Sequence, residues 1–467
     1  MIEHATRREV LVSELQANRS IADELRATIS GSVVLPSDET YAEARRVWNS
    51  AVEHRPALIV LCERATDVEA AVRVARRYGL PLSVRGGGHD WAGRAICPDG
   101  LVIDLTRMRD VVVDLQRMVA TVAGGAKVKN VAAAADAHGL LAALGNCGTV
   151  GMAGLTLGGG YGPFIGAHGL ATDNLLGAEV VLADGRRVTA DAHNEPELFW
   201  ALRGGGGNFG AVTSLQIQLH EKRHMLAGSI LYPWSEAKNV LSRYAAFAAT
   251  APDELGLFVG MASGPDGQLA VQLAPLWNGE EHRGERVMRD LQALGTPLFA
   301  QVRPMTYSDI LAPVDAMLEQ KDGCHWWTRT RWLPALTPGA IDVMIAAVAS
   351  KTSPHSMLFI HPFHGAATRV APHATAFGLR REHFLLEIIP AWEPNGDDGS
   401  THRQWAQELW HSLAPFALPG DYANLLGPED REQAAHAYGS NGARLRALKR
   451  RFDPDNVFAS AIPLPEE

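Results

Sequence analysis

The chain has 467 residues, of which 46% are hydrophobic and 20% are charged, and its formal net charge at pH 7 is -9. This composition is typical of a globular protein with more than one domain, and the acidic balance argues against a nucleic-acid partner. No segment is long and apolar enough to span a membrane, and no apolar stretch follows the N-terminal arginines as in a signal peptide. We therefore expect a cytoplasmic protein that binds neither nucleic acid nor membrane.

In chain order, residues 1–219 predict most of an α+β domain. Short apolar runs typical of strands alternate with helical patterns; the runs lie at 57–62, 81–84, 100–105 and 178–183, and the helical patterns at 66–79 and 128–139. Residues 220–419 predict a second domain of longer strands and amphipathic helices, with strands at 356–363 and 383–392 and helices at 235–250, 284–295 and 402–416. Residues 420–467 return to a turn-rich pattern.

The four cysteines, Cys62, Cys97, Cys147 and Cys324, are too few and too dispersed for a disulfide framework. No pair has the spacing of a zinc site, so we expect no metal. For Cys62, Cys97 and Cys324 we expect buried thiols without a chemical role.

Glycine is concentrated between 145 and 162, in the segment GNCGTVGMAGLTLGGGYG. A core strand does not tolerate so many glycines, because each one forfeits side-chain packing. The pattern therefore indicates that the backbone itself is a binding surface, and exposed amide groups suit the pyrophosphate of a dinucleotide. A nicotinamide-type fold is disfavoured, because the one GxGxxG match, Gly205, Gly207 and Gly210, follows a helical pattern and precedes a strand, the reverse of the required order.

A second glycine cluster, Gly86 to Gly88, stands directly before His89. Taken alone, the cluster could be a tight turn followed by a surface imidazole, or a backbone that closely approaches a ligand.

Five ordered blocks decide between these interpretations, because together they resemble the berberine-bridge-enzyme-like FAD oxidases of the vanillyl-alcohol-oxidase superfamily. The blocks are RGGGH at 85–89, the segment at 145–162, GLATDNLLGAEVVLADG at 169–185, ELFWALRGGGGNFGAVTS at 197–214 and YGSNGARLRALKRRFDPDNVF at 438–458. The resemblance implies a PCMH-type FAD-binding domain of two α/β subdomains, formed by residues 1–219 and completed by 420–467. It also implies a substrate domain, residues 220–419, whose antiparallel sheet covers the flavin ring.

The resemblance further implies covalent FAD. In the family, the histidine after the glycine turn, here His89, bonds the flavin 8α-methyl group, and a cysteine at the position of Cys147 can bond flavin C6. Gly148 departs from the pattern, since many relatives have proline there. The residues implied to bind FAD are Arg85, Gly86, Gly87, Gly88, His89, Asp90, Cys147, Val150, Gly151, Gly154, Leu155, Gly159, Gly160, Tyr161, Gly162, Val212, Asn424 and Asn456.

For catalysis, the resemblance implies removal of a hydride from a C–H beside a hydroxyl or amine of a small organic substrate, such as a saccharide or secondary metabolite, with reoxidation by molecular oxygen to hydrogen peroxide. Tyr422 stands in the Tyr-x-Asn motif that supplies the base in sugar-oxidising relatives. The stretch 373–381, which corresponds to the region of the glutamate base of plant alkaloid enzymes, contains no glutamate, so alkaloid ring closure is disfavoured. The resemblance also implies a role for Val150, because in the family a small valine at this position leaves space for oxygen beside the flavin.

Other candidates are less specific. His361 and His364 lie on an expected strand near the substrate, although alternation would turn at least one of them to solvent. Tyr307, Trp326 and Trp327 are interpreted mainly as packing residues, with a pocket wall as the alternative. A dehydrogenase that passes electrons to a quinone or protein remains the alternative function.

Overall fold

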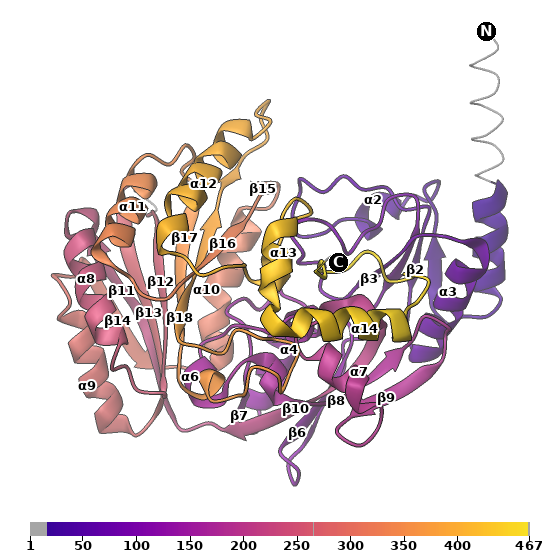
Figure 1. Ribbon diagram of the computed structural model, residues 1–467, viewed down its shortest axis with the longest axis horizontal. Coiled ribbons are helices and arrows are strands. Elements are labelled where there is room, and N and C mark those ends of the chain that lie inside the picture. The colour runs from indigo at the N-terminus through magenta and orange to yellow at the C-terminus, as the bar shows by residue number, and fades with distance from the viewer. Residues whose placement is uncertain (1–15, 265, 466–467) are drawn as a thin grey trace.

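The computed structural model describes residues 16–264 and 266–465, so expectations about the first fifteen residues lie outside the described part of the chain. Within it the chain forms two halves around three main sheets (Figure 1). A four-stranded sheet has the order β1 (Ser32–Val34), β2 (Leu58–Leu61), β4 (Leu101–Asp104) and β3 (Leu82–Arg85). The β2, β4 and β3 strands run parallel, whereas β1 is antiparallel.

The second sheet lies in the same half and is antiparallel. Its order is β5 (Val111–Asp114), β6 (Val119–Ala123), β10 (Ala211–Glu221), β8 (Leu175–Val181) and β9 (Arg187–Asp191), and β7 (Leu140–Ala142) pairs with the far end of β10.

The other half contains a seven-stranded antiparallel sheet. Its order is β14 (Phe299–Pro304), β11 (His224–Pro233), β13 (Leu269–Gly279), β12 (Leu255–Ser263), β17 (Met357–Phe363), β18 (His383–Ile389) and β16 (Arg329–Leu333). The short strands β15 (His325–Trp326) and β19 (Ala391–Trp392) pair separately.

Helices flank these sheets. In the first half they are α2 (Tyr41–Ala44), α3 (Ala65–Tyr78), α4 (Val128–Asp136), α5 (Met152–Leu157), α6 (Ile165–His168), α7 (Pro196–Leu202), α13 (Arg431–Ala437) and α14 (Gly442–Phe452). The second half has α8 (Ala237–Ala248), α9 (Glu281–Gln292), α10 (Tyr307–Gln320), α11 (Pro338–Ala349) and α12 (Ser400–Ser412). The yellow α14 packs beside the magenta α7 in Figure 1, so the C-terminal segment returns to the first half.

The predicted elements follow local sequence signals. Apolar residues recur on one face of α3, and the helix ends at Gly79, whose φ of +64° only glycine adopts without strain. The Glu280 side chain caps α9 by accepting hydrogen bonds from the amides of His282 and Arg283. The α+β fold with a large antiparallel sheet in the second half is thereby confirmed. The domain boundaries at 219 and 419 stay a prediction.

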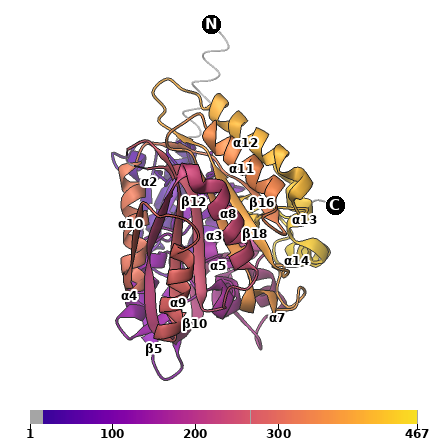
Figure 2. The same cartoon turned by 90° about the vertical axis from the view of Figure 1, so that its left-hand side faces the viewer.

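The large sheet is covered differently on its two faces. Side chains from α8, α9, α11 and α12 share one buried core with the sheet, and these helices form the outer layer that faces the viewer in Figure 2. In contrast, α10 contacts α4 of the first half. The inner face of the sheet, which these four helices do not cover, faces the glycine-rich segments of the first half.

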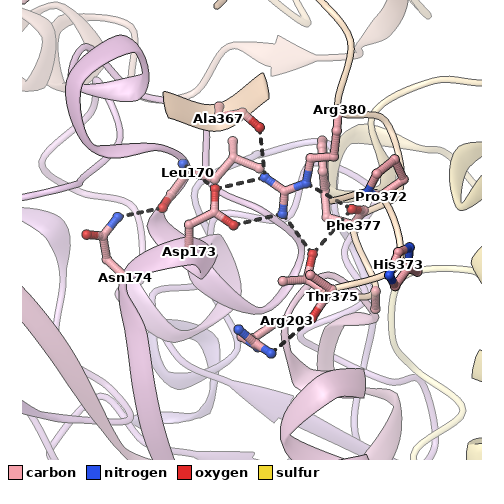
Figure 3. Close-up of polar contacts among 12 residues, drawn as sticks. Leu170, Asp173, Asn174, Arg203, Ala367, Pro372, His373, Thr375, Phe377 and Arg380 are labelled. Carbon is pink, nitrogen blue, oxygen red and sulfur yellow. Dashed lines mark hydrogen bonds and ion pairs between the residues drawn. The ribbon is translucent and has the colours of Figure 1, made fainter. Parts of the chain in front are cut away.

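A buried ion pair ties the two halves together near this junction (Figure 3). Arg380 donates to both carboxylate oxygens of Asp173, at 2.8 and 2.7 Å, and also to the Thr375 hydroxyl at 2.7 Å. Because both charged side chains are buried, the pair holds the 365–380 connection against the 169–174 turn.

Candidate active site

A cavity of about 770 Å³ lies between the two halves, and its volume is within the range of small-molecule sites. One wall is formed by the glycine-rich segments after β3 and β7, and the other by the inner face of β11, β12, β13, β17 and β18 together with α10. Residues near the C-terminus, Phe458 and Ser460 to Ile462, close one end. The cavity therefore joins the parts of the chain that were expected to form the cofactor and substrate sites.

The contacts of the wall formed by the glycine-rich segments, here called the glycine wall, explain why glycine is required there. A Cβ built on Gly87 would lie 2.2 Å from the Gly151 nitrogen, and one on Gly151 would lie 2.3 Å from the Gly87 nitrogen, so the two loops meet backbone to backbone. At Gly154 a Cβ would meet no atom within 4 Å, although this residue lines the cavity. A side chain there would project into the cavity, so these residues suit a ligand that contacts bare backbone, as the expected FAD would.

His89 lies on this wall, stacked on Trp48 with 4.4 Å between ring centroids. Its Nε2 is 3.1 Å from the Thr149 hydroxyl. Burial lowers the pKa of His89 to about 4, so the imidazole is neutral at physiological pH and keeps a free lone pair. That is the protonation state that a nucleophilic imidazole needs.

Cys147 reaches the same point from the second glycine segment. Its Sγ lies 3.8 Å from His89 Nε2 and 3.1 Å from the Thr149 hydroxyl. The other cysteines, Cys62, Cys97 and Cys324, are buried and unpaired, as expected. The structure therefore brings together the two residues that were expected to bond FAD, although they are separated by the whole β4 to β7 region.

Tyr422 also lines the cavity, with its ring against that of Tyr161 at a centroid distance of 4.8 Å. Its hydroxyl oxygen accepts hydrogen bonds from the Gly160 amide at 2.8 Å and from Asn424 Nδ2 at 2.9 Å. Asn424 Nδ2 also donates to the Leu155 carbonyl, which fixes the orientation of its amide. Burial raises the pKa of Tyr422 to about 12, and the two donors act in the opposite direction.

A second polar group lines the substrate side of the cavity. His361 Nε2 is 3.2 Å from Glu387 Oε2, and His361 Nδ1 is 3.5 Å from Asn146 Nδ2. Since the Asn146 amide nitrogen can only donate, the proton of a neutral His361 lies on Nε2 and is donated to Glu387. His361 and His364 both line the cavity, because His364 follows the end of β17 and strand alternation no longer applies to it.

Glu387 is the residue that the sequence analysis missed. A glutamate base was expected only within 373–381, whereas Glu387 lies six residues farther on, in β18, on the same face as Leu385, which also lines the cavity. The alternating pattern of β18 is the signal that could have found it. The missing glutamate at 373–381 is therefore no argument against a carboxylate base.

Most of the expected FAD-binding residues line the cavity: Gly86, Gly87, Gly88, His89, Asp90, Cys147, Val150, Gly151, Gly154, Leu155, Tyr161, Gly162, Val212 and Asn424. Those that do not are Arg85, Gly159, Gly160 and Asn456. Arg85 is paired with Asp104 at 3.2 Å, whereas Gly159, Gly160 and Asn456 occupy positive-φ turns. Gly160 still contributes through its bond to Tyr422. We expect these four to support the site indirectly.

The three aromatic candidates differ in position. Tyr307 is buried and donates to the Gly145 carbonyl at 2.8 Å, which is a packing role. Trp326 lines both the main cavity and a smaller pocket of about 200 Å³, whereas Trp327 lines only the smaller pocket among these two. Within residues 16–264 and 266–465, no group of three or more potential ligands could hold a metal ion. No helix in that part is long and apolar enough to cross a bilayer.

Comparison with known proteins identifies this arrangement. Residues 56–191 match the FAD binding domain family, and residues 421–465 match the berberine and berberine-like family. Over 449 residues the chain is 30% identical to (R)-6-hydroxynicotine oxidase of Paenarthrobacter nicotinovorans, covering 92% of this chain and 96% of that protein. The chain belongs to the berberine-bridge-enzyme-like FAD-linked oxidoreductases.

Two further relatives of this oxidoreductase extend the comparison. The chain is 29% identical over 478 residues to xylooligosaccharide oxidase of Thermothelomyces thermophilus, and the match covers 96% of this chain and 94% of that protein. The crystal structure of 6-hydroxy-D-nicotine oxidase from Arthrobacter nicotinovorans superposes with a TM-score of 0.86 at 29% identity, covering 94% of this chain and 99% of that chain. The family thus includes oxidases of sugars and of amines, and FAD is the cofactor.

Proposed function

We propose that this oxidoreductase is an oxidase that removes a hydride from a C–H beside a hydroxyl or amine of a small organic substrate and passes the electrons to molecular oxygen, giving hydrogen peroxide. The observation that carries the proposal is the environment of Tyr422. Its oxygen lies in the cavity and accepts bonds from Gly160 and Asn424, so neither contact uses the phenolic hydrogen. A phenolate there would keep both donors and one further lone pair for a substrate proton.

We propose that FAD is attached to His89 and Cys147. The support is that both lie on the glycine wall with their reactive atoms 3.8 Å apart. The 8α-methyl group and C6 belong to the same flavin ring, so two bonds to them require reactive side chains that lie close together. When bound, the flavin supplies the hydride acceptor.

The protein then supplies orientation, a base and exclusion of water. The substrate side is walled mainly by apolar residues of β12, β17 and α10, including Leu257, Phe359 and Val314. Polar side chains are fewer than apolar ones on this side; they are those of Ser229, Gln272, Gln301, Arg303, Thr328, His361, His364 and Glu387. This distribution suits a substrate with an apolar body and one oxidisable polar group, such as a secondary metabolite. A saccharide remains the alternative within the proposal, because xylooligosaccharide oxidase is similar to this chain over nearly its whole length.

Glu387 offers a second candidate base, because it is a carboxylate in the cavity whose contacting partner is His361. Its negative charge raises the pKa of Tyr422, so the two groups also influence one another. We assign the base role to Tyr422, since its oxygen is held by two donors that stabilise the deprotonated form, whereas Glu387 accepts only the proton shared with His361. Variants of both residues distinguish these roles.

The acceptor is tested by comparing oxygen with artificial electron acceptors. Candidate alcohols, amines and oligosaccharides are first mixed with the enzyme in the absence of oxygen. A substrate is recognised by the loss of the absorbance of oxidised flavin as the substrate is consumed. The reduced enzyme is then mixed with oxygen, and one hydrogen peroxide per substrate oxidised is the expected result. Slow reoxidation by oxygen together with fast reoxidation by a quinone would instead identify a dehydrogenase.

A further inference from the structure

The segment that carries Cys147 is tied to α10 by one carboxylate, that of Asp315. The Gly148 amide donates to Asp315 Oδ1 at 2.8 Å, and Cys147 Sγ lies 3.8 Å from the same oxygen. A Cβ at position 148 would lie 2.4 Å from Asp315 Oδ2, so the contact requires both an amide hydrogen and the absence of a side chain. Proline, which occurs at this position in many relatives, would remove the donor and displace the carboxylate. The departure at Gly148 is therefore matched by a specific partner.

The thiol beside this carboxylate holds its proton. Burial raises the pKa of Cys147, and the negative charge of Asp315 adds to that effect, whereas the Thr149 hydroxyl opposes it. Because the thiolate is the reactive form of cysteine, bond formation at Sγ requires an acceptor for the thiol proton.

The groups around Cys147 leave one suitable acceptor. His89 Nε2 is a poor base, because burial lowers the pKa of His89 to about 4, and in the proposed holoenzyme this imidazole is itself bonded to FAD. The Thr149 hydroxyl is too weak a base, and the buried Tyr307, which interacts with Cys147, has a raised pKa. Lys127 is a cation whose charge interacts with Cys147 and Asp315. Asp315 has both the reach and the charge.

We propose that Asp315 positions Cys147 and accepts its thiol proton as Sγ bonds flavin C6. This inference rests on the proposed attachment of FAD through Cys147. In the overall reaction one S–H bond and one C6–H bond are lost and one C–S bond forms. The two electrons and two protons that are released reduce molecular oxygen to hydrogen peroxide, so the step requires oxygen and no other oxidant. Lys127 offsets the charge of Asp315 before the proton is transferred.

The test uses Asp315→Asn in a His89→Ala background, where Cys147 is the only remaining attachment residue. Asparagine has nearly the same size, and its Oδ1 can still accept the Gly148 hydrogen bond, but it is not a base. The full-length proteins are incubated with FAD in air, and flavin on the Cys147 peptide is followed by mass spectrometry. Glu319→Gln, an exposed carboxylate on the same helix, is the matched control.

At pH 7 we expect attachment to be about 100-fold slower in the Asp315 variant and unchanged in the Glu319 variant, since general-base assistance contributes 10²–10⁴-fold. Raising the pH should restore attachment about tenfold per pH unit, because the thiolate fraction rises by that factor below the thiol pKa. The ratio of the parent rate to the variant rate should therefore shrink as the pH rises, whereas a positioning role alone would leave this ratio unchanged, because thiolate formation would then limit both proteins equally.

Three results would each contradict a different claim: the role of Asp315, proton transfer to it, or attachment through Cys147. Equal attachment rates with and without Asp315→Asn would overturn the role of Asp315 and leave bicovalent FAD intact. A parent-to-variant rate ratio that is as large at pH 9 as at pH 7 would overturn proton transfer to Asp315. Absence of peptide-bound flavin in the His89→Ala protein itself would instead overturn attachment through Cys147, the proposed function on which the inference rests.

Discussion

Replacing Tyr422 by phenylalanine tests the assignment of the catalytic base, because it removes one oxygen and keeps the ring against Tyr161. General-base assistance contributes 10²–10⁴-fold, so anaerobic reduction of the flavin by substrate should slow by about that factor. The change also leaves the Gly160 amide without its acceptor, whereas Asn424 Nδ2 keeps its hydrogen bond to the Leu155 carbonyl. A buried donor left unpaired costs about 1–3 kcal/mol, so the free energy of unfolding should fall by that amount.

The pH dependence supplies an independent readout of the same variant. Since the pKa of Tyr422 is raised to about 12, the phenol is protonated at neutral pH, and the reduction rate of the parent enzyme should rise with pH. The variant should lose this dependence. Rapid-mixing absorbance measurements without oxygen, at pH 6 to 10, give both quantities.

Glu387→Gln is the matched control, because it removes the other candidate base while keeping the size of the side chain and a contact to His361. We expect it to reduce flavin within about tenfold of the parent rate, and to lower the pKa of Tyr422 by removing a nearby negative charge. If Tyr422→Phe reduces its flavin within about threefold of the parent rate across this pH range while Glu387→Gln is slow, the base is Glu387 and the reasoning about Tyr422 is refuted.

Three further predictions concern oxygen, packing and acid stability. Val150→Leu should slow reoxidation by oxygen in stopped-flow mixing while leaving flavin reduction by substrate nearly intact, because Val150 lines the cavity and a longer side chain would fill it; an unchanged rate removes this role. Asp173→Asn should lower the free energy of unfolding by about 3–5 kcal/mol in urea denaturation, since it leaves the buried Arg380 charge uncompensated, and a loss below 1 kcal/mol would contradict this. Burial lowers the pKa of His383 to about 3, so the stability that depends on the neutral imidazole is present above pH 6.5 and is lost as the pH falls toward 3. Between pH 7 and 5 this residue should lower the free energy of unfolding by about 2 kcal/mol. His383→Gln should abolish this pH-dependent loss in the same assay.

Much of the fold could be predicted from local patterns. The features that were not predicted are those that depend on which parts of the fold lie opposite one another. The predicted helices at 66–79 and 128–139 appear as α3 and α4, because each has an apolar face that packs on a sheet of its own half. The helix α10 was not predicted. It fully buries only Tyr307 and Leu311 and contains Pro313, whereas its side chains Ile310, Val314, Met317 and Leu318 are partly buried and line the cavity.

The candidate site was predictable where backbone geometry dictates the residue type. The glycines at 87 and 151 are required by a contact between two loops, and this requirement is visible in the sequence as an unusual concentration of glycine. Asp315 leaves no such trace in the sequence, and Glu387 leaves only the weaker one of strand alternation, because one carboxylate on an amphipathic helix or strand is ordinarily a solvated side chain. Their roles depend on which residues the fold places opposite them: Gly148 lies opposite Asp315, and His361 lies opposite Glu387.

The most direct test of the account is whether flavin stays with the protein after acid precipitation. We expect the yellow chromophore to remain in the pellet for the parent protein and for His89→Ala and Cys147→Ala separately, because either residue alone holds one bond. It should appear in the supernatant only for the double variant. Release of the flavin from His89→Ala alone would show that Cys147 forms no bond, and release from the parent protein would contradict covalent attachment altogether.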